Sequence, residues 1–499
     1  MKIRSGAIQV FEAITKPAAS CVRHGAPIRE RAATAEGIQK PVGQESSRAQ
    51  ISIRKESQRR PRTLKAFAAA FAVSISAFTP LANAETTLPA KVTFSEHIAP
   101  IVFSNCVECH RKGEAGPFTL TNYRNVSKRA RLIQKVTENR FMPPWHLEPG
   151  YGEFRHTRRL TDRDIALLGK WAENGAPEGD SKKTPPLPTF PEGWRLGKPD
   201  LVVQMTEPFT VPADGPDIYR NFVIPLDLDE DKWVTAIEIR PSSRPVVHHV
   251  LYHADTQGVA RTLDGQDGRP GFNGMRFNKV DLGGWAVGAF PEKLPYGLAR
   301  RLPKGADLIL AGHFHPAGKE MEEQMTAAIY FAKEKPKRQL HEVLVPRGYG
   351  DRSALREGIP PGEKNFKITD VYRLPIKADL IAAWGHAHYI GKTMTGTATL
   401  PDGTVKKLFK INDWNFNWQG QYYYKEAISL PAGTVIKSEI TYDNSADNPR
   451  NPHSPPRLIK WGLQSTDEMG ALIFGFAVDD RDVKGPNHNK KRERESAVK

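Results

Sequence analysis

Cysteine is nearly absent from this sequence, which has three in 499 residues. Cys21 lies near the N-terminus, and Cys106 and Cys109 belong to one short motif, so we expect no structural disulfide. The apolar run 66–78 is too short to span a bilayer with ease. No basic–aromatic repeat occurs, and about half of the net charge of +16 lies within residues 1–84. These features argue against a nucleic-acid-binding protein.

The N-terminal region predicts export. Basic residues at 59–65 precede the apolar run, and Ala82-Asn83-Ala84 provides the small residues that a signal peptidase requires. We predict a signal peptide at 59–84 and a periplasmic or secreted protein without a stable membrane span. An uncleaved anchor is the alternative. Residues 1–58 are polar, basic and aperiodic, which predicts a disordered extension or a mis-annotated start.

The remaining chain changes texture near residue 200. Helical spacing and a capping box at Thr161 and Asp164 occur before that point. Short β-rich runs between Pro, Gly and Asp turns follow it. In order, the expected parts are a small all-α domain at 91–182, a Pro-rich linker at 183–199, two all-β antiparallel sandwich domains at 200–350 and 355–480, and a disordered tail at 484–499.

Cys106-Val107-Glu108-Cys109-His110 has the spacing of a haem-attachment motif. Two thiols separated by two residues can form thioether bonds to haem, and the following histidine can ligate the iron. A redox or zinc Cys-x-x-Cys is the alternative, but the sequence has no second cysteine pair to complete a zinc site. The motif predicts one covalent haem c bound by Cys106, Cys109 and His110.

Met142 is the expected sixth ligand of the haem iron, because two prolines follow it and a Met/His pair suits electron transfer. His146 and His156 are alternatives that their surroundings do not favour. The segment of about 90 residues around these positions resembles a class I cytochrome c. The resemblance implies a small all-α cytochrome c domain that transfers electrons.

A His-x-His motif lies in the last third of the chain, in Gly385-His386-Ala387-His388. In a strand, His386 and His388 point to the same face, because side chains alternate with period two. Met469, far along the chain, would add a soft sulfur ligand, which favours copper and especially its reduced ion. We therefore predict one copper site from these three residues.

Upstream histidines predict a second metal site. His248 and His249 are adjacent, and His313 lies in an apolar run. Consecutive residues of a regular strand face opposite ways, so one shared metal requires a bulge or a strand end at this pair. His315 fits the motif less well, and His253, His341 and His453 are expected to have structural roles.

In this order, the motifs resemble the copper type II, ascorbate-dependent monooxygenases, the peptidylglycine α-hydroxylating and dopamine β-hydroxylating enzymes, over roughly 200–480. The resemblance implies two adjacent jelly-roll-like sandwiches with two copper ions. It implies that one copper stores an electron and that the other binds oxygen and is catalytic. Its ligand sets here would be His248, His249 and His313 for the first copper, and His386, His388 and Met469 for the second.

Together these observations predict an exported haem c- and copper-dependent monooxygenase. It would hydroxylate a C–H bond of a small-molecule or peptide substrate with O₂. Electrons would come through the fused cytochrome segment, with ascorbate or a redox protein as a possible external donor. The alternative is a non-enzymatic periplasmic electron-transfer or copper-binding protein. A third hypothesis is a metal-free β module that binds carbohydrate or protein.

Overall fold

The computed structural model describes residues 88–479, except 115, 275–276, 278 and 287–288. The segment 1–58, the expected signal peptide at 59–84 and the expected tail at 484–499 lie outside the described residues. Among the described helices, none is long and apolar enough to cross a membrane.

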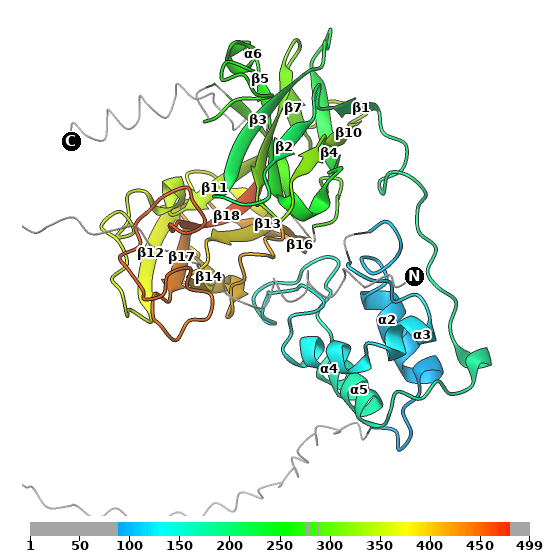
Figure 1. Cartoon of the computed structure of the whole chain (residues 1–499). Helices are drawn as coiled ribbons and strands as arrows, with labels where there is room; N and C mark the ends of the chain where they lie inside the picture. Colours follow the sequence, from blue (N-terminus) through cyan, green and yellow to red (C-terminus); the bar gives the residue numbers. More distant parts are fainter. Residues whose placement is uncertain (1–87, 115, 275–276, 278, 287–288, 480–499) are drawn as a thin grey trace, which may run out of the picture. The chain divides into compact units, whose positions relative to one another are not determined.

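Short helices make up the start of the described chain (Figure 1). They are the π-helical turn η1 (Phe94–Ile98), α2 (Ala99–Asn105), α3 (Tyr123–Ser127), α4 (Ala130–Glu138), α5 (Asp162–Glu173) and the 3₁₀ turn η2 (Ser181–Lys183). The expected capping box is confirmed, because the Thr161 side chain accepts from the Asp164 amide while Asp164 accepts from the Thr161 amide. The helices share an apolar cluster that includes Val102 and Trp171.

Two four-stranded sheets and one two-stranded sheet form the first β region, 201–331. In pairing order the sheets are β1 (Leu201–Gln204), β10 (Thr326–Phe331), β4 (Lys232–Arg240) and β7 (Arg300–Leu302); β3 (Ile218–Pro225), β8 (Asp307–Phe314), β5 (Val247–Asp255) and β6 (Lys279–Ala286); and β2 (Phe209–Val211) with β9 (Met321–Glu323). The 3₁₀ turn η3 (Arg244–Val246) leads into β5, and α6 (Val259–Leu263) follows it. Val250 and Leu308 of one large sheet share an apolar cluster with Ile237 and Ile329 of the other.

Two further four-stranded sheets form the second β region, 338–479. Their strands, in pairing order, are β11 (Arg338–Val345), β18 (Gly470–Asp479), β13 (Ala378–Ala387) and β16 (Tyr422–Leu430); and β12 (Phe366–Arg373), β17 (Val435–Tyr442), β14 (Gly391–Thr399) and β15 (Val405–Ile411). The 3₁₀ turn η4 (Arg347–Gly350) follows β11. Leu380 and Phe474 of one sheet share an apolar cluster with Met394 and Ile440 of the other.

The expected architecture, a small all-α cytochrome c domain followed by two jelly-roll-like sandwich domains, is wrong. The described chain is mostly β, with eighteen strands and five short α-helices, and all described residues belong to one compact unit. Trp145, Leu147 and Phe154, between α4 and α5, are buried in the apolar cluster of the second β region. Leu147 and Phe154 also form β-bridges with Ile411 and Tyr424. Burial of these apolar side chains against a sheet removes them from water, which a separate helical domain would not achieve.

The segment 183–199 is not a free linker either. The Trp194 ring packs against the apolar cluster of β4 and β10. The Arg195 guanidinium donates to Glu108 Oε1 at 2.8 Å, and its backbone amide donates to Glu238 Oε1 at 3.1 Å. The arginine therefore fastens the helical segment to the first β region.

The boundary between the two β regions also differs from the expected one. β11 lies inside the range 200–350, yet all eight of its residues pair with β18 (Figure 1). An unpaired edge exposes backbone donors and acceptors, and β18 satisfies them along the full length of β11. The second β region therefore begins at Arg338, inside the range expected for the first sandwich.

Candidate metal centre

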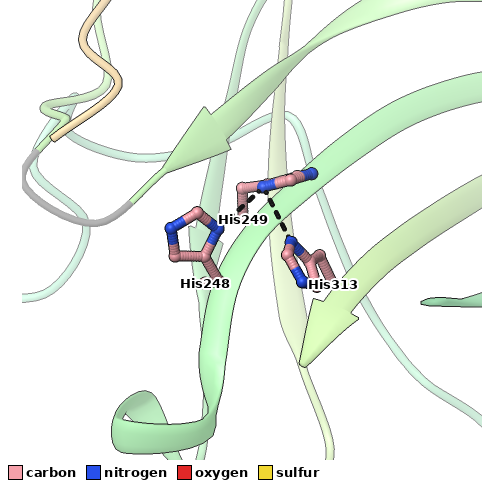
Figure 2. A group of neighbouring side chains, drawn as sticks. All are labelled: His248, His249 and His313. Carbon is pink, nitrogen blue, oxygen red and sulfur yellow. Dashed lines mark hydrogen bonds between the residues drawn. The ribbon is translucent and has the colours of Figure 1, made fainter. Parts of the chain in front are cut away.

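Three histidines of the first β region converge on one point. His248 Nδ1 lies 3.1 Å from His249 Nδ1, and His313 Nδ1 lies 3.4 Å from the same atom. Figure 2 shows the three rings turned toward one another. His249 and His313 are directly opposite in the β5–β8 pairing, and the register shifts between Val247 and His249. The expected bulge at the histidine pair is therefore confirmed, and it lets both rings reach one point.

The outer nitrogens of two rings have partners that leave Nδ1 free. His313 Nε2 lies 3.1 Å from Asp217 Oδ2, and His248 Nε2 lies 3.3 Å from the backbone oxygen of Phe416. An acceptor on one ring nitrogen fixes the proton there and presents the other nitrogen as a ligand. With the proton on Nε2, both rings can present Nδ1 to the shared point.

Asp217 is itself held by several donors. Although burial opposes its ionisation, hydrogen bonds from His313, His315 and Ser465 hold the pKa of this carboxyl well below its usual range. His315 Nδ1 lies 2.7 Å from Asp217, and the Ser465 hydroxyl donates to it. The aspartate is therefore a fixed negative charge beside the three histidines.

The geometry of this cluster fits a metal ion. Zinc–imidazole bonds of about 2.0–2.1 Å in a tetrahedral site hold ligand nitrogens roughly 3.3 Å apart, close to the separations of His248 and His313 from His249. Burial first, and neighbouring histidines second, lower the pKa of His248 to about 3 and hold that of His249 well below its usual range. A histidine must be neutral to bind a metal, and these low pKa values keep His248 and His249 neutral. Imidazole alone suits zinc, copper, iron and nickel, so this cluster does not select one metal.

The second histidine pair lies at the end of β13. His386 and His388 have ring centroids 5.3 Å apart. His386 Nδ1 lies 2.6 Å from Gln419 Oε1, and His388 Nδ1 lies 3.2 Å from the backbone oxygen of Asp467. Both rings therefore present Nε2 as the free nitrogen. Burial, the largest cause, lowers the pKa of His386 to about 4 and that of His388 to about 3.

The structure places Met469 beside this pair. Ala387, the last residue of β13, pairs with Gly470, the first residue of β18. His388 and Met469 are the residues just beyond this pair. Glu468 Oε1 accepts from the backbone amides of His388 at 2.6 Å and of Met469 at 2.9 Å. One buried carboxyl thus holds the backbones of two candidate ligands. Met469 is 7% exposed and lines the same cavity as His386 and His388.

The two histidine clusters face one cavity of about 1400 Å³. His249 lines it from the first cluster, and His386, His388 and Met469 line it from the second. It exceeds the roughly 300–1,000 Å³ usual for small-molecule sites. The clusters are also neighbours, because Phe416 stacks on His248 with ring centroids 4.4 Å apart and meets His388 edge-on at 5.8 Å.

The Cys-x-x-Cys-His motif forms a tight turn after α2. The amides of Cys109 and His110 both donate to the Cys106 carbonyl, at 3.2 and 2.9 Å. His110 Nδ1 lies 3.0 Å from the Phe118 carbonyl, which leaves Nε2 free, as an axial ligand requires. Burial raises the pKa of the Cys106 thiol to about 12 and also raises that of Cys109. Such thiols are poor nucleophiles, which disfavours a redox role for the free pair.

Met142, the expected sixth ligand, lines a separate hollow of about 10 Å³ with Thr137 and Ile165. Its role stays a prediction. Of the two alternatives, His156 lines the large cavity, as Glu108 of the haem motif does.

Three positioning residues were not found from the sequence: Asp217, Phe416 and Gln419. Asp217 lies at the start of β3, far from any histidine motif. The other two belong to the aromatic-rich stretch 413–421, which alternates polar and aromatic residues. That unusual composition was the only available signal, because their histidine partners are distant in the chain.

Comparisons with known proteins do not assign this chain to a family. No family model matches it, and no curated protein matches it. The expected assignment to the class I cytochromes c and the copper type II ascorbate-dependent monooxygenases is therefore wrong. It also fails because the helical segment is not the separate domain that a fused cytochrome c requires.

Solved structures give only weak similarities. N-glycanase F (PNGase F), described as a glycosylasparaginase from Flavobacterium meningosepticum, is 12% identical, with 56% of this chain and 97% of that chain covered and a TM-score of 0.24. PNGF-II is 9% identical, with 56% and 65% covered and a TM-score of 0.24. The major capsid protein P2 of bacteriophage PM2 is 8% identical, with 53% and 97% covered and a TM-score of 0.20. At these TM-scores neither a fold nor an activity carries over to this chain.

Proposed function

We propose that this protein is an exported copper-dependent oxidoreductase that hydroxylates a C–H bond with O₂. The observation that carries the proposal is that two histidine clusters line one cavity, one with three imidazoles and one with two imidazoles beside a methionine. The thioether of Met469 favours copper over zinc, and especially the reduced ion.

The two clusters differ in a way that suits different tasks. His248, His249 and His313 form a partly buried set with Asp217 behind it, which suits a metal that changes charge without binding substrate. His386, His388 and Met469 provide three ligands at the cavity wall, so a position stays open toward the cavity. We therefore assign O₂ and substrate to the second cluster.

Copper bound there would supply O₂ activation by one-electron chemistry. The overall reaction places one oxygen atom in the C–H bond and releases the other as water. It consumes two electrons, which a one-electron reductant such as ascorbate or a redox protein supplies in two steps, and two protons, which come from solvent. The protein holds the two ligand rings through Gln419 and Asp467, holds the His388 backbone through Glu468, and presents a small-molecule or peptide substrate along the cavity.

We also propose haem c at Cys106, Cys109 and His110, whose turn and free Nε2 fit covalent attachment and iron ligation. Haem c would supply one-electron transfer. Glu108 and Asn105, on either side of Cys106, line the same large cavity as the histidine clusters. That shared cavity supports a role for the motif in delivering electrons to them.

Oxygen uptake by copper-loaded protein with ascorbate tests the proposal. We expect wild-type protein to consume O₂ and His386→Ala to fall to the rate of metal-free protein. His97→Gln is the matched control, because this histidine lies at the end of η1 and belongs to neither cluster. Uptake that survives in His386→Ala, or copper-loaded wild type that consumes no O₂, would contradict an oxygenase.

A non-enzymatic copper or electron carrier is the second candidate. The three-histidine cluster favours it, because three imidazoles can hold a metal that stores an electron without reacting with a substrate. Copper binding and reversible reduction without any O₂ uptake would support this candidate instead.

A further inference from the structure

The loop 413–421, between β15 and β16, contacts both histidine clusters. The Phe416 ring stacks on His248, and its carbonyl oxygen lies 3.3 Å from His248 Nε2. Gln419 Oε1 lies 2.6 Å from His386 Nδ1. The loop therefore contacts one ligand of each cluster through atoms only three residues apart.

Internal and external contacts hold the loop in this shape. The side-chain nitrogen Nε2 of Gln419 donates to the Phe416 carbonyl at 3.1 Å. One hydrogen bond therefore joins the Phe416 carbonyl, which lies beside His248, to the Gln419 side chain, which lies beside His386. At the loop's start, Trp414 Nε1 donates to the His388 carbonyl at 3.1 Å, and Arg450 pairs with Asp413 at 2.7 Å. The path from one cluster to the other is thus short, polar and continuous.

Each of these contacts depends on where a histidine carries its proton. A metal on His248 Nδ1 requires the proton on Nε2, which then donates to the Phe416 carbonyl. A metal on His386 Nε2 requires the proton on Nδ1, which then donates to Gln419 Oε1. Metal at either cluster therefore selects the same loop arrangement.

We propose that the loop 413–421 links the two metal sites, so that metal bound at one site raises the affinity of the other. The inference rests on the proposed function only in taking both clusters as copper sites. The first ion fixes the tautomer of its histidine, and the hydrogen bond between Phe416 and Gln419 then favours the loop arrangement that the other cluster needs. The second ion then binds to a cluster whose positioning contacts are already formed, and it loses less conformational freedom.

Copper(I) titration against a chromophoric chelator tests this linkage. The affinity of the three-histidine site is measured with the second site intact and with it removed by His386→Ala and His388→Ala. Coupling of this kind is typically about 5–150-fold. We expect the ratio of the two affinities to lie in that range for wild type. The ratio should fall near one when Gln419→Ala is added both to the protein with the second site intact and to the protein without it.

Asn417→Ala is the matched control, because this side chain is exposed on the same loop. It should keep the wild-type ratio. Gln419→Glu keeps the acceptor for His386 but loses the donor to the Phe416 carbonyl, so it should restore the paramagnetic resonance spectrum of copper(II) at the second site, which Gln419→Ala should alter, and leave the ratio near one. A merely structural role for Gln419 would change thermal stability without changing that spectrum.

The outcomes separate the two proposals. An unchanged ratio in Gln419→Ala, or a ratio near one in wild type, overturns the linkage even if O₂ uptake is present. A normal linkage without O₂ uptake overturns only the oxygenase. Wild-type protein that binds no copper overturns both.

Discussion

The backbone amide of His388 donates a 2.6 Å hydrogen bond to the carboxyl of Glu468, a residue with no exposed surface. The same oxygen accepts from the amide of Met469, the next residue after Glu468. Burial is the largest cause that raises the pKa of Glu468 to about 8. This buried carboxyl therefore holds two candidate ligands next to each other: His388, which follows β13, and Met469, which precedes β18.

Replacing Glu468 should separate the two ligand backbones. Glu468→Ala leaves two buried amides unpaired, at a cost of about 1–3 kcal/mol each, and should abolish copper binding at the second site. Glu468→Gln keeps the accepting oxygen and should retain both the fold and the copper. Thermal unfolding and copper stoichiometry measure the two effects. Equal copper binding in both variants would show that this carboxyl does not position the site.

Asp217 should control metal affinity at the three-histidine site. Loss of a carboxylate behind a ligand histidine typically costs about 10–100-fold in metal affinity. We expect that loss for Asp217→Asn, because the side chain keeps its size but not its charge. Asp214→Asn, at an exposed position three residues earlier, is the control and should bind metal normally. Competition with a chelator of known affinity measures both variants, and equal affinities would exclude the positioning role.

The sulfur of Met469 should select the reduced ion. Met469→Leu conserves volume and should cost less than about 1.5 kcal/mol of stability, yet it should remove the preference of the second site for copper(I). Met394→Leu is the matched control, because Met394 is fully buried in the apolar core of the neighbouring sheet and belongs to neither histidine cluster. Copper(I) and zinc titrations of the two variants make the comparison. Equal preference in both would remove the thioether from the ligand set.

Covalent haem should depend on both cysteines of the motif. Cys106→Ser with Cys109→Ser removes both thioether bonds, so denatured protein should lose its haem to acid–acetone extraction. Wild-type protein treated in the same way should retain its haem. Absorbance of the extracted protein measures the result. Haem that resists extraction from the double variant would contradict the assignment.

The helical segment should not be stable without the second β region. Phe154 packs against Tyr424 with ring centroids 4.5 Å apart, and both are buried. We expect Phe154→Ala to lower the free energy of unfolding by about 3–5 kcal/mol. Val371→Ala, at a position 57% exposed, should have little effect. Denaturant unfolding measures both, and a small loss for Phe154→Ala would restore an independent helical domain.

Local patterns explain what was predictable. The capping box at Thr161 depends on residues three apart, and the bulge at His248 follows from the opposite directions of adjacent strand side chains. His386 and His388 share a face because side chains of a strand alternate with period two. Each of these predictions needed only a few neighbouring residues.

The division of the chain into its parts could not be predicted from local patterns. Trp145, Leu147 and Phe154 are apolar in any context, and their burial against β15 and β16 depends on which surface is within reach. β11 likewise carries no local mark that assigns it to β18. A composition that resembled a helical domain and a linker therefore led to the wrong architecture.

The residue pattern alone was enough to single out the candidate chemical groups: the cysteine motif, the paired histidines and one distant methionine. How these groups are held, through Asp217, Phe416, Gln419 and Glu468, emerged only from the folded chain. Ligand types are visible residue by residue, because softness and charge are intrinsic to a side chain. Their orientation depends on hydrogen bonds between segments as distant as residues 217 and 465, and such contacts exist only after the chain has folded.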